Sequence, residues 1–250
     1  MTLAYDVTGD GPAVLLLHST VCDRRMWDPQ VAALAAAGRR VVRLDLVGHG
    51  DTPVPAGRFD ETGAIAALLD DLGITETALV GASGGGRVAL EFAARWPDRV
   101  TALALLCTAL RGHEAGPELQ AFDEREEALL EAGDIAGAVD LNVGLWVGPD
   151  AGDETRELVR VMQRHAFDVQ LAAEDVAYEP VRTEPDLARI TAPALLVTGA
   201  HDLPDFREIA AHLAGVLPQA RHVELDWAGH LPSLERPGAV NALLLEFLAG

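Results

Sequence analysis

The amino-acid sequence predicts an α/β fold: a doubly wound, mostly parallel sheet of about seven strands, flanked by helices, with a helical cap inserted between two strands. Short apolar runs alternate with longer segments of helical periodicity, which is typical of a parallel sheet with right-handed crossovers. Several of these runs are continuously apolar, as strands buried on both faces are. The alternation stops between residues 111 and 185, where helical pieces follow one another without a convincing strand.

The expected elements follow from these patterns in chain order. The expected strands are runs rich in Val, Leu and Ala, at residues 13–19, 40–48, 77–83, 100–109, 193–200 and 221–229. The expected helices end at Gly or precede Pro, and they cover residues 27–38, 60–73, 85–97 and 205–218. We therefore expect a core domain formed by residues 1–110 and 186–250, with residues 111–185 as a lid.

Composition and charge exclude several classes of partner. The chain has 250 residues, 49% of them hydrophobic and 23% charged, which is ordinary for a globular protein. Its net charge of −20 argues against binding nucleic acid or an anionic membrane surface, since both need a basic face. The N-terminal residues lack a basic, apolar leader pattern, so a cytoplasmic location is expected. With nucleic acid and membrane disfavoured, the expected partner is a small-molecule substrate. Cys22 and Cys107 lie in apolar stretches and are expected to be buried free thiols.

A glycine-rich stretch, GASGGG, joins an expected strand to an expected helix around Ser83. Glycine costs roughly 0.5–1 kcal/mol relative to Ala inside either element, so this clustering indicates a sharp turn or a close backbone approach. Residues 81–85 match the pattern G-x-S-x-G, a turn that exposes its serine at the carboxyl end of a strand. Ser83 is therefore the candidate nucleophile, and the backbone N–H of Gly84 would face an anion formed beside it.

Two other kinds of glycine-rich turn fit the sequence less well. A Walker A phosphate loop needs Gly-Lys-Ser or Gly-Lys-Thr, and all 19 basic residues here are Arg. A dinucleotide-binding turn needs G-x-G-x-x-G, but Ser83 occupies the second glycine position. The stretch GHGDTP at residues 48–53 begins correctly and then ends in Pro53. Nucleotide binding is thus disfavoured at both places.

A serine nucleophile needs a histidine base and a carboxylate that orients it, in the chain order Ser, Asp or Glu, then His for this kind of architecture. Asp202 in GAHDLPDF follows one expected strand, and His230 in WAGHLPSLERP follows the next. Both would then lie at the carboxyl edge of the sheet, beside Ser83. Asp205 is the alternative acid, although its place in the first turn of a helix favours a capping role.

Five stretches in register, LLLHST, RLDLVGHGDT, GASGGG, GAHD and AGHLPSLERP, resemble the α/β-hydrolase fold superfamily. The resemblance runs from about Leu3 to the end of the chain and is weakest in residues 111–185, which resemble that superfamily's cap. The stretch DRRMWDPQ and its adjoining strands are similar to the 3-oxoadipate enol-lactonase-like and cofactor-free haloperoxidase-like branches.

The resemblance implies a serine hydrolase that acts on a small carboxylic ester or lactone through an acyl-enzyme, with no metal or organic cofactor. It also implies that the backbone N–H of Thr20 is the second oxyanion donor beside Gly84. Hydrolysis of a carbon–carbon bond and perhydrolysis on the same triad remain alternatives. So do a ligand receptor with slow turnover and a non-catalytic interaction module.

The sequence departs from the family pattern at three places. Gly84 stands where relatives carry a larger side chain after the serine, so the floor of the pocket is expected to be roomier. Ser19 follows His18, where relatives usually have glycine. Only one strand is expected before residues 13–19, so the first strand of the family is expected to be missing.

Three further residues are assigned from their context. Asp45, at the end of an expected strand, is expected to hold the following turn by hydrogen bonds rather than to act as the catalytic acid. Trp146, in a glycine-bounded stretch of the cap, is a candidate substrate contact. Arg24 is a second candidate, for a carboxylate on the substrate, although Arg24 and Arg25 together also fit a solvated flank of a helix.

Overall fold

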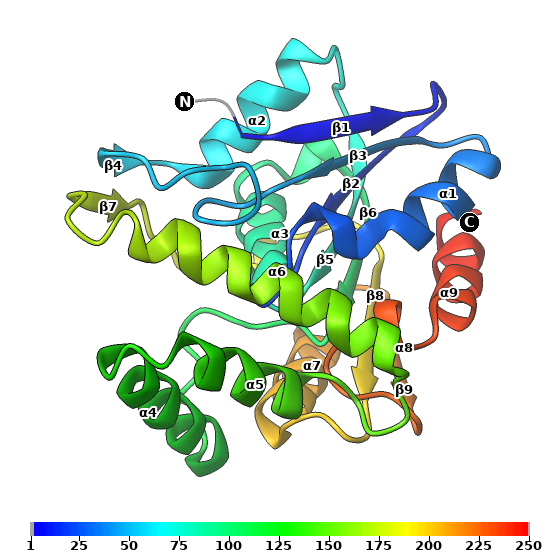
Figure 1. Cartoon of the computed structure of the whole chain (residues 1–250). Helices are drawn as coiled ribbons and strands as arrows, with labels where there is room; N and C mark the ends of the chain where they lie inside the picture. Colours follow the sequence, from blue (N-terminus) through cyan, green and yellow to red (C-terminus); the bar gives the residue numbers. More distant parts are fainter. Residues whose placement is uncertain (1–2, 250) are drawn as a thin grey trace.

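The computed structural model describes residues 3–249 and contains a seven-stranded sheet with helices on both faces (Figure 1). The strands stand in the spatial order β1-β3-β2-β5-β6-β8-β9. Their bounds are β1 Tyr5–Thr8, β2 Ala13–Leu17, β3 Arg40–Leu44, β5 Thr77–Ala82, β6 Val100–Leu106, β8 Ala194–Gly199 and β9 Ala220–Leu225. The predicted α/β class and number of strands are confirmed.

All neighbouring strands of this sheet run parallel except β1, which pairs antiparallel with β3. The central strands β5 and β8 are buried at every residue, which explains their continuous apolar sequence. Their carboxyl ends therefore meet at one edge of the sheet. Several predicted strands end earlier than expected, because the residues after them form the loops that carry polar side chains to this edge.

The helices cover two faces of the sheet, and alternate strand residues belong to different cores. Val14 and Leu16 pack in one cluster with α1 and α9, whereas Leu15 and Leu17 pack in the other with α2 and α3. The bounds are α1 Asp28–Ala36, α2 Glu61–Asp71, α3 Gly84–Arg95, α4 Pro117–Glu131, α5 Ile135–Trp146, α6 Asp153–Leu171, α7 Pro204–Val216, α8 Pro232–Glu235 and α9 Pro237–Ala249. Helix α9 was not among the predicted helices.

Helices α4, α5 and α6 all lie in the chain between β6 and β8, within residues 111–185, which we call the helical insertion (Figure 1). The expectation that this segment contains no strand was wrong. Residues Tyr178–Pro180 form β7, which pairs with β4, Gly57–Phe59, in a separate two-stranded sheet. Three residues that include a proline carry too little periodicity to be recognised as a strand. Within residues 3–249, no helix combines the length and apolarity needed to cross a membrane.

Candidate active site

Ser83 sits between the last residue of β5 and the first residue of α3, with backbone angles φ 51° and ψ −117°. A non-glycine residue with positive φ is strained and persists only where the surroundings fix it. The turn is held by Ser83 N–H donating to Leu106 O (3.0 Å) and by Ala109 N–H donating to Ser83 O (3.0 Å). The nucleophile turn predicted from the glycines is therefore formed.

Glycine is required in this turn because backbone segments approach closely. A Cβ at Gly81 would lie 2.6 Å from the carbonyl oxygen of Gly85, and a Cβ at Gly85 would lie 2.3 Å from that of Leu17. No side chain fits at those distances. The glycines thus let helix α3 start directly above strands β2 and β5, so that its N-terminus faces the Ser83 side chain.

Two backbone N–H groups beside Ser83 have no hydrogen-bond partner among residues 3–249. One belongs to Gly84, in the first turn of α3, where no carbonyl of the helix can accept it. The other belongs to Thr20, and the carbonyl of the same residue lies 2.9 Å from His49 Nε2. A Cβ at Gly84 would lie 3.9 Å from the Thr20 nitrogen, so the two groups are neighbours. They can bind an oxyanion together.

His18 fixes the loop that carries Thr20. Its Nε2 accepts the N–H of Leu46 (2.9 Å), so its Nδ1 carries the proton and donates to Ser19 O (2.8 Å). Burial and the neighbouring His49 lower the pKa of His18 to about 3. The ring is therefore neutral at neutral pH. It holds the loop through one donated and one accepted hydrogen bond.

The expectation of a roomier pocket floor at Gly84 needs correction. A Cβ at Gly84 would lie only 2.5 Å from Thr20 Cγ2, so the methyl group of Thr20 already fills this space. The missing side chain of the helix is replaced by one from the opposite loop.

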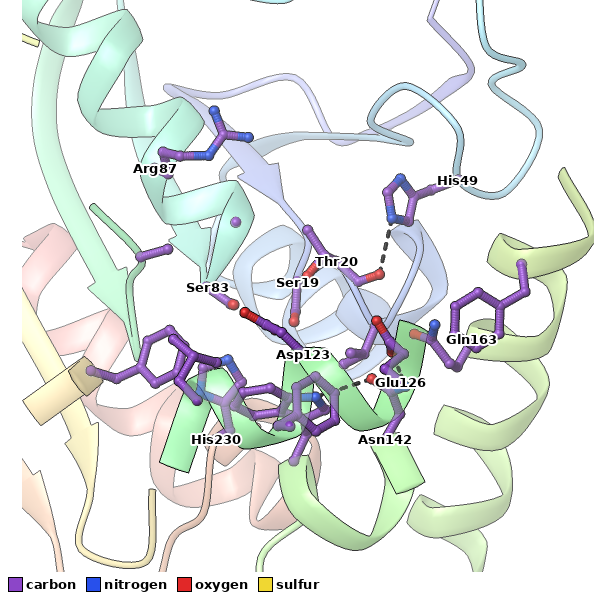
Figure 2. A pocket seen from close by; sticks show the side chains of 18 of the residues that line it. Ser19, Thr20, His49, Ser83, Arg87, Asp123, Glu126, Asn142, Gln163 and His230 are labelled. Atoms are coloured by element: carbon purple, nitrogen blue, oxygen red, sulfur yellow. Dashed lines mark hydrogen bonds between the residues drawn. The ribbon is translucent and has the colours of Figure 1, made fainter. Parts of the chain in front are cut away.

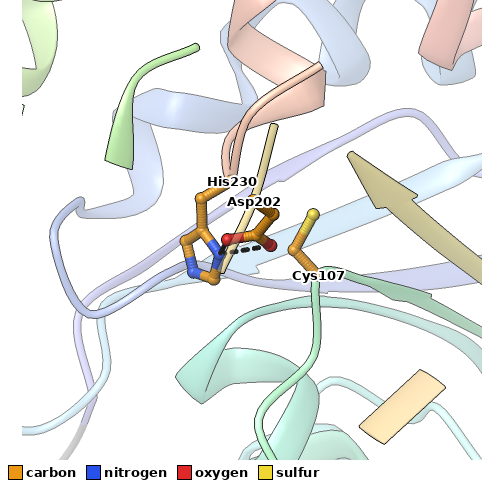
Figure 3. A group of neighbouring side chains, drawn as sticks. All are labelled: Cys107, Asp202 and His230. Atoms are coloured by element: carbon orange, nitrogen blue, oxygen red, sulfur yellow. Dashed lines mark hydrogen bonds and ion pairs between the residues drawn. The ribbon is translucent and has the colours of Figure 1, made fainter. Parts of the chain in front are cut away.

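His230 and Asp202 form a buried pair at the carboxyl ends of β9 and β8 (Figure 3). His230 Nδ1 donates to the Asp202 carboxylate, with distances of 2.9 and 2.8 Å to its two oxygens. Asp202 Oδ1 also accepts the N–H of Leu203 (2.8 Å). Because Nδ1 is engaged, Nε2 is the nitrogen left to exchange protons with a reacting group.

Cys107 lies beside this pair, with ligand atoms of all three residues within 4.8 Å of one another. Burial and the nearby Asp202 raise the pKa of the Cys107 thiol, and its Sγ lies 3.7 Å from Gly229 O. A neutral thiol is a poor metal ligand, and His230 Nδ1 is already bound to the carboxylate. The group is better described as a hydrogen-bonded pair packed against a thiol.

Ser83, Gly84, Thr20 and His230 all line one cavity of about 460 Å³ (Figure 2). Side chains of α4, α5 and α6 line the same cavity, so the helical insertion forms the wall facing the sheet edge. The imidazole of His230 is held between aromatic rings, with ring centroids 4.6 Å from Trp146 and 4.2 Å from Phe206. The structure thus brings Trp146 to the cavity, as the sequence predicted.

Arg24 does not line this cavity, contrary to its role as a candidate substrate contact. Its guanidinium pairs with Asp6 (3.0 Å), Asp51 (2.7 Å) and the buried Asp45. Asp45 further accepts the N–H groups of Arg24 (2.8 Å) and Asp51 (2.9 Å), so it holds the turn after β3 as expected. Three carboxylates compensate the charge of Arg24 away from the cavity.

Asp205 also takes the structural role expected of it, but with a different partner. It lies in the first turn of α7 and accepts the N–H of Gly116 (2.6 Å), the residue before α4, and a hydrogen bond from His113 Nε2 (3.0 Å). Asp205 therefore connects the start of the helical insertion to helix α7, which follows β8 in the chain.

Polar residues of the cavity wall were missed by the sequence analysis. Asp123, Glu126, Asn142 and Gln163 come from α4, α5 and α6 and line the cavity with Ser83. The three-residue spacing of Asp123 and Glu126 places them on one face of a helix, but the sequence does not show which face turns inward.

The chain is similar to known proteins in sequence and in fold. Residues 14–243 match the family model described as "Alpha/beta hydrolase family". The chain belongs to this family. The predicted superfamily is confirmed, and the strand and helix order above is that of an α/β hydrolase.

Three relatives illustrate the range of this family. A carboxylesterase, YbfK, of Bacillus subtilis (strain 168) is 27% identical, with 96% of this chain and 81% of the relative covered. The crystal structure of a hydrolase from Pseudomonas aeruginosa PA01 superposes with a TM-score of 0.81 at 32% identity, covering 99% of this chain and 94% of the other. An enol-lactonase from Burkholderia xenovorans LB400 also gives 0.81, at 28% identity, with 99% and 96% covered.

Proposed function

We propose that this protein is a serine hydrolase that cleaves a small carboxylic ester or lactone through an acyl-enzyme on Ser83, with His230 as base and Asp202 as its partner. The observation that carries the proposal is that Ser83 and His230 line one cavity, while Asp202 engages His230 Nδ1 at 2.8 and 2.9 Å. The family membership and the likeness to a carboxylesterase and an enol-lactonase support the same reaction class.

In the first half of the reaction, His230 Nε2 takes the proton of the Ser83 hydroxyl as its oxygen attacks the substrate carbonyl carbon. The carbonyl oxygen becomes an anion and accepts hydrogen bonds from the N–H groups of Gly84 and Thr20. The imidazolium is stabilised by Asp202 and returns its proton to the leaving alcohol. Each such N–H is worth roughly 10²–10³ in rate in related chemistry, which accounts for a strained turn at Ser83.

In the second half, water enters the cavity and His230 removes one of its protons as its oxygen attacks the acyl carbon. The ester bond to Ser83 breaks, and the serine oxygen regains a proton from His230. The helical insertion acts as a lid that encloses this step. Its contacts with the cavity and with Asp205 support that role.

A serine-directed fluorophosphonate tests the proposal. The chain contains only three serines, and the reagent should label the protein once, at Ser83, because only an activated hydroxyl attacks phosphorus readily. Ser83→Ala should abolish labelling and hydrolysis of an ester and lactone panel. Ser233→Ala is the matched control, since this buried serine lies outside the cavity. Labelling that persists in Ser83→Ala refutes the assignment. Rapid product formation only with added hydrogen peroxide would instead identify a perhydrolase.

A further inference from the structure

We infer that the wall of the cavity formed by the helical insertion is a subsite for a positively charged amine on the substrate, so that the preferred ester or lactone carries an ammonium group. This inference rests on the proposed ester hydrolysis and names its substrate class. The residues that carry it are Asp123, Glu126 and Gln163, which line the cavity together with Ser83.

The charges of the cavity are unbalanced. Asp123 and Glu126 line it from α4, and among its lining residues Arg87 is the only arginine. The Arg87 guanidinium pairs with Glu91 at 2.9 Å, a carboxylate that Arg111 also contacts at 2.7 Å, and within the described part of the chain neither arginine pairs with Asp123 or Glu126. The chain contains no lysine, and its net charge is −20, so a cationic ligand is also favoured at long range. The missing partner of these carboxylates is thus a cation supplied from outside the chain.

Glu126 is held in place by a chain of hydrogen bonds. Trp146 Nε1 donates to Asn142 Oδ1 (3.0 Å), and Asn142 Nδ2 donates to Ala138 O (2.9 Å) and to Glu126 Oε1. This uses the polar atoms of the Asn142 amide, so Asn142 itself offers little to a ligand. The second carboxylate oxygen of Glu126 has no hydrogen-bond partner among residues 3–249. Since Trp146 also packs against His230, the carboxylate has a defined position relative to the catalytic base.

A buried, unpaired acceptor beside these carboxylates independently indicates a ligand. Gln163 lines the cavity from α6 and is only 4% exposed, yet its Oε1 has no hydrogen-bond partner in the described part of the chain. Figure 2 shows its amide directed toward Glu126 and Asn142. A buried polar atom without a partner destabilises the folded chain, so a ligand that donates hydrogen bonds here would remove this penalty.

The ionisation of both carboxylates supports the same conclusion. Burial raises the pKa of Glu126, with the hydrogen bond from Asn142 opposing the rise. Burial and then the negative charge of Asp205 raise the pKa of Asp123. The Glu126 carboxylate is thus partly removed from water without a cation to compensate it, and the exposed Asp123 adds a second negative charge near it. An ammonium group would supply that charge and up to three donors at once.

A carboxylate on the substrate would be repelled at this subsite. It would face two carboxylates and the Gln163 acceptor. A neutral hydroxyl group could donate one hydrogen bond but would leave the charges uncompensated. The subsite therefore favours a cationic substrate over an anionic one.

A matched set of ethyl esters tests this inference. Ethyl 6-aminohexanoate, ethyl 6-hydroxyhexanoate, ethyl heptanoate and monoethyl pimelate share five methylene groups and differ only in the terminal group of the acyl chain. Acetylcholine and 3,3-dimethylbutyl acetate repeat the comparison of cation and neutral isostere on the alcohol side. We expect kcat/KM for the cationic member of at least one pair to exceed that of the neutral isostere about tenfold or more, with monoethyl pimelate the poorest acyl substrate.

Glu126→Gln should lower the ratio of kcat/KM for cationic over neutral ester about tenfold, because glutamine keeps an oxygen to accept from Asn142 but loses the charge. Glu127→Gln is the matched control: this exposed neighbour on α4 does not line the cavity, and its variant should keep the wild-type ratio. Calorimetry with Ser83→Ala gives a second readout, in which the cationic ester should bind more tightly than its isostere.

The outcomes separate the two proposals. Turnover of neutral esters without a preference for the cation, or a hydroxy ester preferred over the amine, overturns the ammonium subsite and leaves the serine hydrolase intact. An unchanged ratio in Glu126→Gln overturns it as well. If no ester is hydrolysed and Ser83 is not labelled, the proposed function itself fails, and equal binding of both esters by Ser83→Ala then refutes the subsite separately.

Discussion

The Cγ2 methyl group of Thr20 occupies the space that a side chain at position 84 would need, because a Cβ on Gly84 would lie 2.5 Å from it. The two residues also carry the two unpaired N–H groups beside Ser83. A side chain at either position therefore affects both the floor of the cavity and the geometry of the oxyanion site.

This relationship predicts that substitutions at the two positions are coupled. Gly84→Ala alone should cost about 1–3 kcal/mol of stability through overpacking and lower kcat/KM about tenfold, because the displaced N–H groups bind the oxyanion less well. Thr20→Ser removes the methyl group, so the double variant Thr20→Ser/Gly84→Ala should recover most of both losses. Denaturant titration and ester kinetics on all four proteins measure the coupling. Thr20→Val/Gly84→Ala, which keeps a methyl group, should not recover; equal recovery would contradict the steric explanation.

Asp202→Asn should reduce kcat by up to about 10⁴ while leaving the fold intact, since an amide donates where His230 Nδ1–H must donate and thereby selects the wrong tautomer. Steady-state kinetics and thermal unfolding of the same preparation measure both effects. Asp45→Asn is the comparison. It removes the ion pair with Arg24, so it should lower stability by about 1–3 kcal/mol and affect kcat far less. A larger loss of kcat in Asp45→Asn than in Asp202→Asn would reverse the two assignments.

The lowered pKa of His18 should make the free energy of unfolding depend on pH. Its folded-state pKa of about 3 lies below its unfolded value of 6.5, so the unfolded chain binds more protons between these values. The contribution of His18 is fully present above pH 6.5 and is lost as the pH falls, by about 1.4 kcal/mol per unit. Between pH 7 and pH 5, urea titration should show a loss of about 2 kcal/mol from this residue.

The variant His18→Gln should flatten this dependence, because glutamine keeps an acceptor for the N–H of Leu46 and cannot be protonated. His212→Gln provides the control, as His212 is exposed on α7. The same steepness of the pH dependence in His18→Gln and in the wild type would show that groups other than His18 cause it.

The contacts of Asp205 with Gly116 and His113 should stabilise the start of the helical insertion locally. Burial alone would raise its pKa, but hydrogen bonds from Gly116 N–H and His113 hold the pKa below its usual range, so the carboxylate is charged and bonded at neutral pH. Asp205→Asn should weaken these charge-assisted bonds and increase hydrogen exchange about tenfold or more in residues 112–118. Glu76→Gln, an exposed change just before β5, should leave exchange there unchanged. Uniformly faster exchange over the whole chain would indicate global destabilisation instead.

The sequence by itself determined the parts of this protein that depend on local pattern and chain order. Continuous apolar runs specified the central strands such as β5 and β8, and the glycines around Ser83 specified the turn, because only glycine allows the backbone approach found there. Asp202 and His230 could be placed at neighbouring strand ends, since parallel strands end at a common edge.

Only the tertiary structure decided which side chains from distant segments line the cavity. The docking of α4, α5 and α6 fixes which of their faces turns toward Ser83, and it brings Glu126 and Gln163 together from separate helices. The contact of Thr20 with Gly84 and the pairing of Arg24 with three carboxylates likewise join distant segments. Helical periodicity records that one side of a helix is apolar, but the partner of each polar side chain is set by packing between elements, which has no local signature in the sequence.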